Sequence, residues 1–417
     1  MRRTAAAGRS TLVDDSDARD GAASARGPLE VLRAFLRLGV TSFGGPIAHL
    51  GYLRTEFVER RQWLDDRQFA QLLAACQFLP GPASSQLGFA IGLLRAGWLG
   101  ALAAFVAFTV PSALLLFALA RTGMSAGEGA AGAITHGLKL VAVAVVAHGV
   151  LQMARRILIE GALILIAALS AATILLVEGA VAQLGVIAAG ALLGDMLCRR
   201  PHTLDGPSLT LPYGRRAAGV AATIFVALLA PALFAAGTEP SLAGLAAAFY
   251  RAGALVFGGG HVVLPLLETS LVGNDWMTKD VFLAGYGAAQ AVPGPMFSLA
   301  AYLGAETSTG MSAVIGSFVA IVAVFLPGFL LLVAILPVWA RLHNVPSAQR
   351  SVAGVGASVV GLLGAALYDP VWTAAINGSV DVAIGVVALA ILHAFNRSAL
   401  LAVAWCVGAA LVVWQVG

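Results

Sequence analysis

The chain repeats two unusual breaks in its apolar sequence. Phe-Gly-Gly-Pro at 43–46 returns as Phe-Gly-Gly-Gly at 257–260, and Pro-Gly-Pro at 80–82 returns at 293–295. The second break keeps its neighbours at one fixed offset, since Trp63, Phe69, Ala75, Gln77 and Ser85 return as Trp276, Phe282, Ala288, Gln290 and Ser298. Val110-Pro111-Ser112 is echoed by Leu326-Pro327-Gly328. Such a set is hard to obtain by chance, so the sequence predicts a duplication.

The composition places this duplication in a membrane. Of 417 residues, 59% are hydrophobic and 11% are charged, whereas a soluble protein carries about 25% charged residues. Apolar runs at 104–120 and 161–177 approach the roughly 20 residues that span a bilayer. The net charge of +4 is modest and follows mostly from loop arginines, so no nucleic-acid partner is predicted. The expected surroundings are a lipid bilayer.

Two features outside the repeat receive plain structural interpretations. Residues 1–28 mix arginines and aspartates without an apolar core, which argues against a secretory signal peptide and predicts a disordered cytoplasmic tail. The cysteines at 76, 198 and 406 lie far apart in apolar sequence, where neither a disulfide framework nor a metal-ligand spacing is visible. They are expected to be small packing residues.

Arginines surround the first pair of breaks, and basic loops favour the cytoplasmic side. They are Arg33, Arg37, Arg54, Arg60, Arg61, Arg67 and Arg95. All can be cytoplasmic if 30–60 and 67–95 are hairpins that enter the membrane, break and return. Each arm has about 13 residues, or roughly 20 Å of helix, which is shorter than a hydrocarbon core of about 30 Å.

The second pair of hairpins, 243–272 and 279–306, has few flanking arginines and is expected to open to the outside. Four crossings follow each pair, near 97–120, 133–152, 157–177 and 181–198, and near 311–337, 351–368, 379–395 and 399–416. One extra helix near 217–236 inverts the second half. The predicted fold is therefore an all-α polytopic membrane protein with two inverted homologous halves, each with two broken, re-entrant hairpins followed by about four transmembrane helices. The predicted units are 1–28 (tail), 29–198 (first half), 199–242 (linker and extra helix) and 243–417 (second half).

The breaks suggest an anion site. Pro82 suits the first turn of a new helix, which leaves the amides of Ser84, Ser85 and Gln86 at or near its N-terminus, with little use for their hydrogens inside the helix. A helix N-terminus carries roughly half a positive charge and binds oxyanions through backbone amides. Gly44 and Gly45 aim a second helix start, with His49 one turn on.

The alternative interpretation is a kink, since Pro and Gly are common in membrane helices. Two copies of a paired break favour a cavity instead, because non-helical backbone at membrane depth needs protein or water to satisfy it. The second half has Phe297 opposite Ser84 but offers acids that could carry protons. Glu56 and Arg60 could simply pair along a helix. Whether His49 and His261 are core or site residues stays open.

Two signatures now resemble the chromate ion transporter family. The N-terminal one is Phe43-Gly44-Gly45-Pro46, His49, Gly51-Tyr52, Arg60, Trp63, Cys76-Gln77 and Pro80-Gly81-Pro82. The C-terminal one is Phe257 to His261, Leu264-Pro265, Trp276, Gln290 and Pro293-Gly294-Pro295. They run through about 30–120 and 245–335. The resemblance implies a multi-pass protein of the bacterial inner membrane that exports chromate, driven by the membrane potential or a proton gradient, and so confers chromate resistance. Sulfate, a tetrahedral dianion of similar size, is the expected competitor.

The predicted substrate-binding residues are Gly44, Gly45, His49, Gln77, Gly81, Ser84, Ser85, Gln86, Gly259, His261, Gln290 and Gly294. The charged candidates for binding or coupling are Arg54, Arg60, Glu268 and Glu306. No enzymatic motif, cofactor site or metal spacing is visible. A transporter or channel for sulfate or another inorganic anion remains the alternative, and a homodimer is left open.

Overall fold

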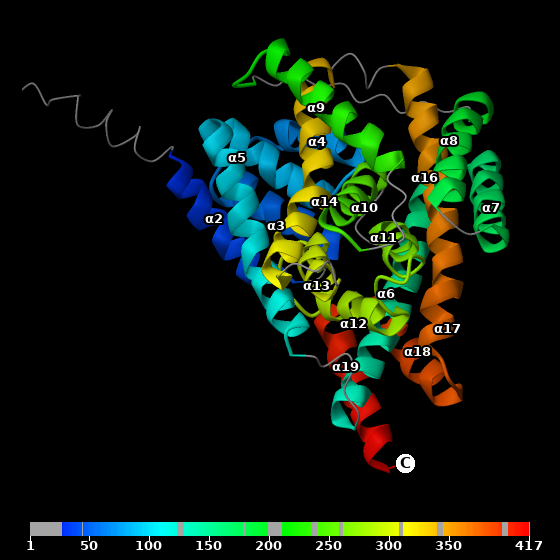
Figure 1. Ribbon diagram of the computed structural model, residues 1–417. Coiled ribbons are helices and arrows are strands. Elements are labelled where there is room, and N and C mark those ends of the chain that lie inside the picture. Colours follow the sequence, from blue (N-terminus) through cyan, green and yellow to red (C-terminus); the bar gives the residue numbers. More distant parts are fainter. Residues whose placement is uncertain are drawn as a thin grey trace, which may run out of the picture.

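A computed structural model describes residues 27–43, 45–122, 129–177, 180–198, 211–234, 240–257, 262–307, 312–339, 345–393 and 399–416. All regular structure in these segments is helical, which confirms the all-α prediction (Figure 1). The predicted tail falls outside them up to residue 26, so its disorder stays a prediction. Gly44, Gly259 and His261 also lie outside the described residues.

The first half begins with short helices in the predicted places. Its elements are α2 (Pro28–Thr41), α3 (Gly45–Arg54) with the π-helical turn η1 (Thr55–Arg60), α4 (Asp66–Phe78), α5 (Ala83–Ala120), α6 (Ala130–Ile157), α7 (Gly161–Leu176) and α8 (Ala180–Leu197). An aspartate, Asp65, caps α4 in a capping box with Gln68. The breaks therefore separate helical arms, as the hairpin prediction requires.

The helix α5 is two arms joined by a sharp bend. Ala96 and Gly97 have non-helical backbone angles, and a Cβ on Gly92 would lie only 2.4 Å from the carbonyl oxygen of Gly100. In a straight helix, residues eight apart are about 12 Å apart, so the short arm 83–95 must fold back on the long arm 98–120.

The second half repeats this order after one extra helix, α9 (Arg215–Phe234). Its elements are α10 (Leu242–Leu255), α11 (Val263–Leu271), α12 (Lys279–Ala289), η4 (Met296–Ser298), α13 (Leu299–Glu306), α14 (Ala313–Ile335) with η5 (Leu336–Val338), α16 (Pro346–Ala366) with η6 (Leu367–Trp372) and α17 (Thr373–Ala375), α18 (Ser379–His393) and α19 (Ala399–Val416). The backbone itself repeats, since φ is positive at the equivalent pairs Gln62 and Asp275 (50° and 59°) and Gly81 and Gly294 (119° and 106°).

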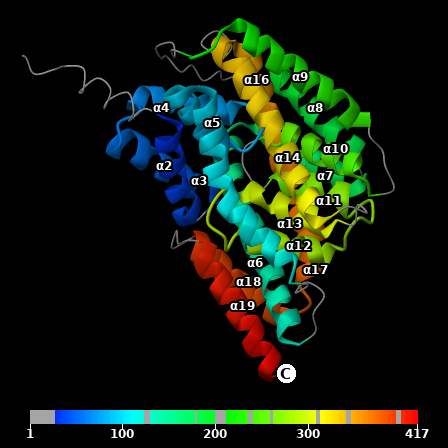
Figure 2. The same cartoon turned by 60° about the vertical axis from the view of Figure 1, so that its left-hand side comes forward.

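The two halves exchange their last helices. The pair α7 and α8 packs on α16 of the second half, while α18 and α19 pack on α6 of the first half. Figures 1 and 2 both show the red α19 beside the teal α6, and the orange α16 beside the green α7 and α8. Arg350 on α16 binds Asp195 on α8 at 2.8 Å, and His136 on α6 lies 2.8 Å from Asp381 on α18. Each half is thus held by the other.

Five helical segments in the described part of the chain are long and apolar enough to cross a membrane: 83–120, 130–157, 215–234, 313–338 and 346–375. The other predicted crossings, α7, α8, α18 and α19, are apolar helices that are shorter. Large apolar side chains face outward from several of these helices, including Leu176, Val181 and Phe234 at 83%, 83% and 85% exposure. Water would disfavour such a surface and lipid suits it, as befits a multi-pass membrane protein. The three cysteines are free and buried, as expected of packing residues.

Candidate functional site

The breaks meet in crossed pairs between the halves. The amide of Gly81, in the first Pro-Gly-Pro, donates to the carbonyl of Val256 at 2.7 Å, and the amide of Gly294, in the second, donates to the carbonyl of Ser42 at 2.9 Å. Ser42 and Val256 hold equivalent places directly before Phe43 and Phe257. We call these contacts the Ser42 junction and the Val256 junction. Each joins one half's Pro-Gly-Pro to the other half's glycine-rich break.

A long helix completes each junction at its own proline. A Cβ on Gly294 would lie 2.8 Å from the Ser112 hydroxyl oxygen, and one on Gly81 would lie 3.0 Å from the Gly328 Cα. Ser112 and Gly328 are equivalent residues, each following the proline inside α5 or α14. Both break glycines need a positive φ and a missing side chain. Gly81 and Gly294 therefore have a conformational reason to be glycine, and their predicted role in substrate binding stays a prediction.

The N-terminus of α5 lies at the Val256 junction. The helix begins at Ala83, and the Gln86 amide donates to the Pro82 carbonyl at 2.9 Å. The prediction of a free amide on Gln86 was therefore wrong, because this residue is the first that can reach a carbonyl four positions back. The amides that lack an acceptor inside the helix are those of Ala83, Ser84 and Ser85. The Gln86 side chain donates to the carbonyls of Pro80 (2.9 Å) and Gly328 (3.0 Å), which fastens the break to α14.

Two equivalent serines differ in their partners. Ser298 lies 2.6 Å from Ser112, whose hydroxyl donates to the Thr109 carbonyl, so Ser298 donates to Ser112. Ser85 is 3% exposed, and its hydroxyl has no protein partner. The repeat gives the reason, because Gly328 stands where the first half has Ser112. The first-half break therefore holds a buried donor available to a ligand, beside the amides of Ser84 and Ala83.

The Ser42 junction contains His49, which is 2% exposed. Its Nε2 lies 3.1 Å from the Ser42 carbonyl oxygen, and its ring meets Phe108 edge-on at 5.6 Å between centroids. Its Nδ1 has no protein partner, nor have the buried hydroxyls of Ser42 and Thr109. Gly45, the neighbouring candidate, begins α3. Ser42 and Thr109 could not be predicted from the sequence, because they carry no motif of their own.

The two glutamines already have partners. The Gln77 side chain accepts a hydrogen bond from Arg156 at the C-terminal end of α6. Gln290 follows the last residue of α12, and its side chain donates to the Met296 sulfur at 3.3 Å. Both fix breaks in place, so a ligand would have to displace these bonds.

The candidate arginines are exposed and form ion pairs. Arg54 binds Asp66 at 2.7 Å and also Glu59, and the hydrogen bond and charge of Asp66 raise the pKa of Arg54. Arg60 lies 3.6 Å from Glu56 one turn away, as the structural alternative predicted. The two guanidinium groups are therefore exposed and do not lie at the junctions, although Glu56 itself is buried.

The candidate acids lie in the second half. Glu268 is half-buried in α11, and Glu306 is the half-buried last residue of α13. One carboxylate oxygen of Glu306 has no hydrogen-bond partner.

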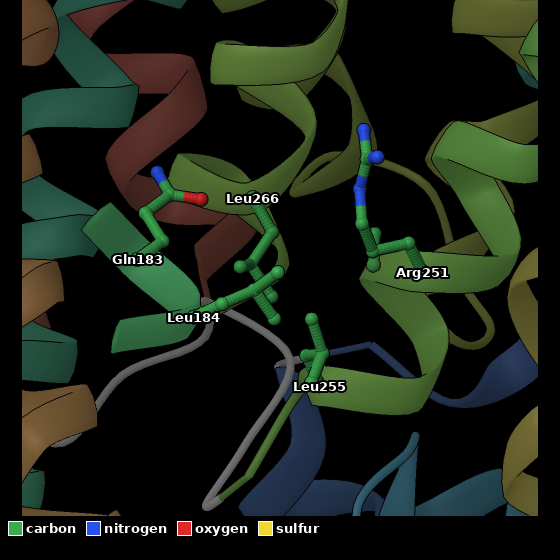
Figure 3. Close-up of a pocket in the computed structure, with 6 residues that line it drawn as sticks. Gln183, Leu184, Arg251, Leu255 and Leu266 are labelled. Atoms are coloured by element: carbon green, nitrogen blue, oxygen red, sulfur yellow. The ribbon is translucent and has the colours of Figure 1, made fainter. Parts of the chain in front are cut away.

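A small cavity lies elsewhere, between α8, α10 and α11. Its lining is Gln183, Leu184, Arg251, Ala252, Leu255 and Leu266. Figure 3 shows the Arg251 side chain extending away from Leu255, and its guanidinium donates to the Ala232 carbonyl and the Ser270 hydroxyl. Gln183 donates to Pro265 and Thr269. Because the polar groups of the lining bind protein and the remainder is apolar, this cavity suits an oxyanion less well than α5 does.

Comparison with known proteins gives a consistent result. A family model described as chromate transporter matches residues 29–195 and 243–414, in agreement with two halves. A chromate transport protein of Pseudomonas aeruginosa is 30% identical over 347 residues, which cover 82% of this chain and 80% of that protein. A probable chromate transport protein of Synechococcus elongatus is 29% identical, over 81% of this chain and 83% of its own. No solved structure matches the chain.

Proposed function

The chain belongs to the chromate transporter family, and from this premise we propose that it exports chromate across the bacterial inner membrane as a secondary transporter. The membrane potential supplies a driving force, since each charge moved is worth about 2.3 kcal/mol per 100 mV. Export would lower cytoplasmic chromate and confer resistance. The relatives' names support chromate as the cargo.

One observation carries the proposed binding site: the buried, unpartnered Ser85 hydroxyl at the N-terminus of α5. The Ser85 amide, with those of Ala83 and Ser84, adds donors that the helix itself does not use. Together they offer neutral hydrogen-bond donors at the positive end of a helix dipole, which compensates a dianion without burying a fixed cation. Weak neutral donors also let the ion leave.

Burial implies that the site must open. Ser84 and Ser85 are 6% and 3% exposed, and they adjoin in sequence the Val256 junction and the Gln86 bond to α14. Separation of the two halves at that junction would admit the ion. Rocking of inverted repeats around a central site is the usual means of alternating access.

Uptake of labelled chromate into inverted membrane vesicles tests the function. Vesicles with the protein should accumulate chromate above vesicles without it, and added sulfate should compete. Accumulation of sulfate without chromate would instead establish the alternative, a transporter for another inorganic anion, because these donors recognise charge and shape. No accumulation of either anion would contradict the proposal.

The site has its own test, the double variant Ser84→Ala, Ser85→Ala. Each hydrogen bond to a charged partner is worth about 1.5–3 kcal/mol, so loss of the hydroxyls should weaken chromate binding by roughly tenfold or more. Ser317→Ala is the matched control, because this buried serine donates to the Ala301 carbonyl within the second half. Unchanged affinity in the double variant would place the anion elsewhere.

A further inference from the structure

His49 has a defined tautomer. A carbonyl oxygen can only accept, so the Nε2 atom that lies 3.1 Å from the Ser42 oxygen carries the hydrogen. In the neutral ring Nδ1 is then an acceptor with a free lone pair. That atom is buried and has no protein partner. Buried polar atoms are nearly always satisfied, so a free base in the core of the molecule needs a reason.

The Ser42 carbonyl connects His49 to the contact between the two halves. It accepts from the His49 ring of the first half and from the Gly294 amide of the second half. Opening of the Ser42 junction would break the bond to Gly294 and expose the ring to water. His49 could then exchange a proton with whichever side of the membrane the junction faces.

Charged groups around His49 already have partners. The helix α3 packs on η1 and on α5. The charged side chains of these elements are paired: Arg54 with Glu59 and Asp66, Glu56 with Arg60 and Arg61, and Arg95 with Glu30. Arg121, at the other end of α5, lies near Glu306. The ring itself contacts Ser42 and Phe108, so a charge that arrives nearby meets no fixed counter-charge in contact with the ring.

Aromatic packing links His49 to the proposed anion site. Phe108 contacts both His49 and Phe35, with centroids 5.6 Å and 6.3 Å apart. Phe35 in turn packs under Gly88, one turn beyond Ser85 in α5. Charges separated by packed apolar side chains are screened much less than charges in water. A dianion at α5 would therefore favour the protonated form of His49.

We propose that Nδ1 of His49 takes up one proton when a divalent oxyanion binds at α5, so that one net negative charge, and not two, moves with each anion. This inference rests on the proposed function. The proton adds to the Nδ1 lone pair from the water on the loading side, and the same bond breaks on the release side. The imidazolium offsets half of the charge that must pass through the apolar core.

The variant His49→Gln tests the role, because glutamine can keep an N–H donor toward Ser42 but cannot titrate. In proteoliposomes, the chromate affinity of the wild type should rise as pH falls, by up to about tenfold per pH unit for one linked proton. In His49→Gln, the part of the pH dependence of chromate affinity that comes from this proton should be lost. The net charge moved per chromate, measured as the ratio of current to labelled flux, should double from one to two. Protonation of chromate itself is common to both proteins and cancels in the comparison.

Two further measurements complete the test. Glu306→Gln should keep the wild-type slope and charge, and loss of both in that variant alone would move the coupling proton to Glu306 and overturn the inference. If His49→Gln does not fold, chromate added to weakly buffered wild-type protein should still take up about one proton per anion bound, above the blank, and no uptake would overturn the inference. Equal slopes and charges in wild type and His49→Gln would do the same. Wild-type proteoliposomes that move no chromate would instead contradict the proposed function.

Discussion

The two halves share a backbone but not a chemistry. Both have the same order of short arms, the same positive-φ residues and the same crossed hydrogen bond at a glycine. At the junctions, however, the first half is polar where the second is apolar. The equivalent pairs are Ser42 and Val256, His49 and Val263, Ser84 and Phe297, Thr109 and Phe325, and Ser112 and Gly328.

The apolar residues of the second half include aromatic side chains that pack on one another and on the first half. Phe325 contacts Phe297 at 5.8 Å, and Phe329 stacks on Phe89 of the first half at 4.5 Å between centroids. The unpartnered polar atoms at the junctions lie instead in the first half, and they include the hydroxyls of Ser42, Ser85 and Thr109 and the Nδ1 acceptor of His49. The duplication thus supplies the geometry twice, while the divergence leaves binding chemistry to one copy and shape to the other.

The largest effect is expected in an experiment on the orientation of the two halves in the membrane. Cysteines at Gln62 and Asp275, in a background without the native three, should react with an impermeant reagent from opposite sides, because basic segments stay cytoplasmic. The two sites are equivalent, exposed and similarly strained, with φ of 50° and 59°, so reactivity should not differ for local reasons. Labelling of both from one side would show that the halves are parallel and not inverted.

Alanine at the two break glycines should abolish or strongly reduce transport. Each variant forces a side chain into a left-handed conformation, at about 1–2 kcal/mol, and creates a clash. The clashes differ: Gly294→Ala meets the Ser112 hydroxyl at 2.8 Å, whereas Gly81→Ala meets the Gln86 side-chain nitrogen at 2.9 Å and the backbone of Gly328 at 3.0 Å. Ser112→Gly should therefore partly rescue folding of Gly294→Ala, measured by detergent-solubilised yield and thermal unfolding. Equal behaviour with and without Ser112→Gly would mean that strain, and not contact, decides.

The equivalent serines should separate binding from stability. Ser298→Ala removes a buried hydrogen bond to Ser112 and should lower the unfolding free energy by about 1 kcal/mol with little change in chromate affinity. Ser85→Ala removes a hydroxyl without a protein partner, so it should leave stability unchanged and weaken chromate binding by about tenfold, the value of one hydrogen bond to a charged group. The opposite pattern would assign the anion to the second half.

Much of this arrangement could be predicted from the sequence, because the repeated residues determine where helices start and end. Pro-Gly-Pro fixes where a helix starts, and apolar length fixes which helices are long, so the arms and their breaks appear where expected. The membrane placement of these arms stays a prediction, since helix bounds say nothing of depth.

The crossed pairing of the breaks could not be predicted, because it depends on contacts between residues more than 170 positions apart, such as Gly81 and Val256. The same limit applies to Ser85. Its sequence neighbourhood matches that of Ser298, and only the distant exchange of Ser112 for Gly328 leaves it without a partner. The expectation of a free amide at Gln86 was wrong for a local reason. Pro82 alone does not fix the first helical residue, and because α5 begins at Ala83, the Gln86 amide already reaches the Pro82 carbonyl.

The smallest expected effect concerns the contacts that hold the first helix of each half, α2 or α10, in place. In the first half Glu30 binds Arg95 at 3.0 Å, and Arg95 lies over the Trp63 ring at 4.9 Å. The equivalent of Glu30 is Gly244, and the equivalent tryptophan, Trp276, fills the space there, since a Cβ on Gly244 would lie 2.8 Å from its ring. The first helix is thus held by an ion pair in the first half and by aromatic packing in the second.

Glu30→Gln should therefore lower the unfolding free energy by only about 0.5–1 kcal/mol, because the pair is partly exposed and solvent screens it. The loss should shrink in high salt, which screens such charges. Gly244→Ala is the matched variant, and whatever it costs through its clash with Trp276 should not vary with salt. Thermal unfolding of both variants and the wild type at low and high salt measures this difference. A loss in Glu30→Gln that is independent of salt would mean that Glu30 acts through packing, as its counterpart does, and that the two contacts are physically alike.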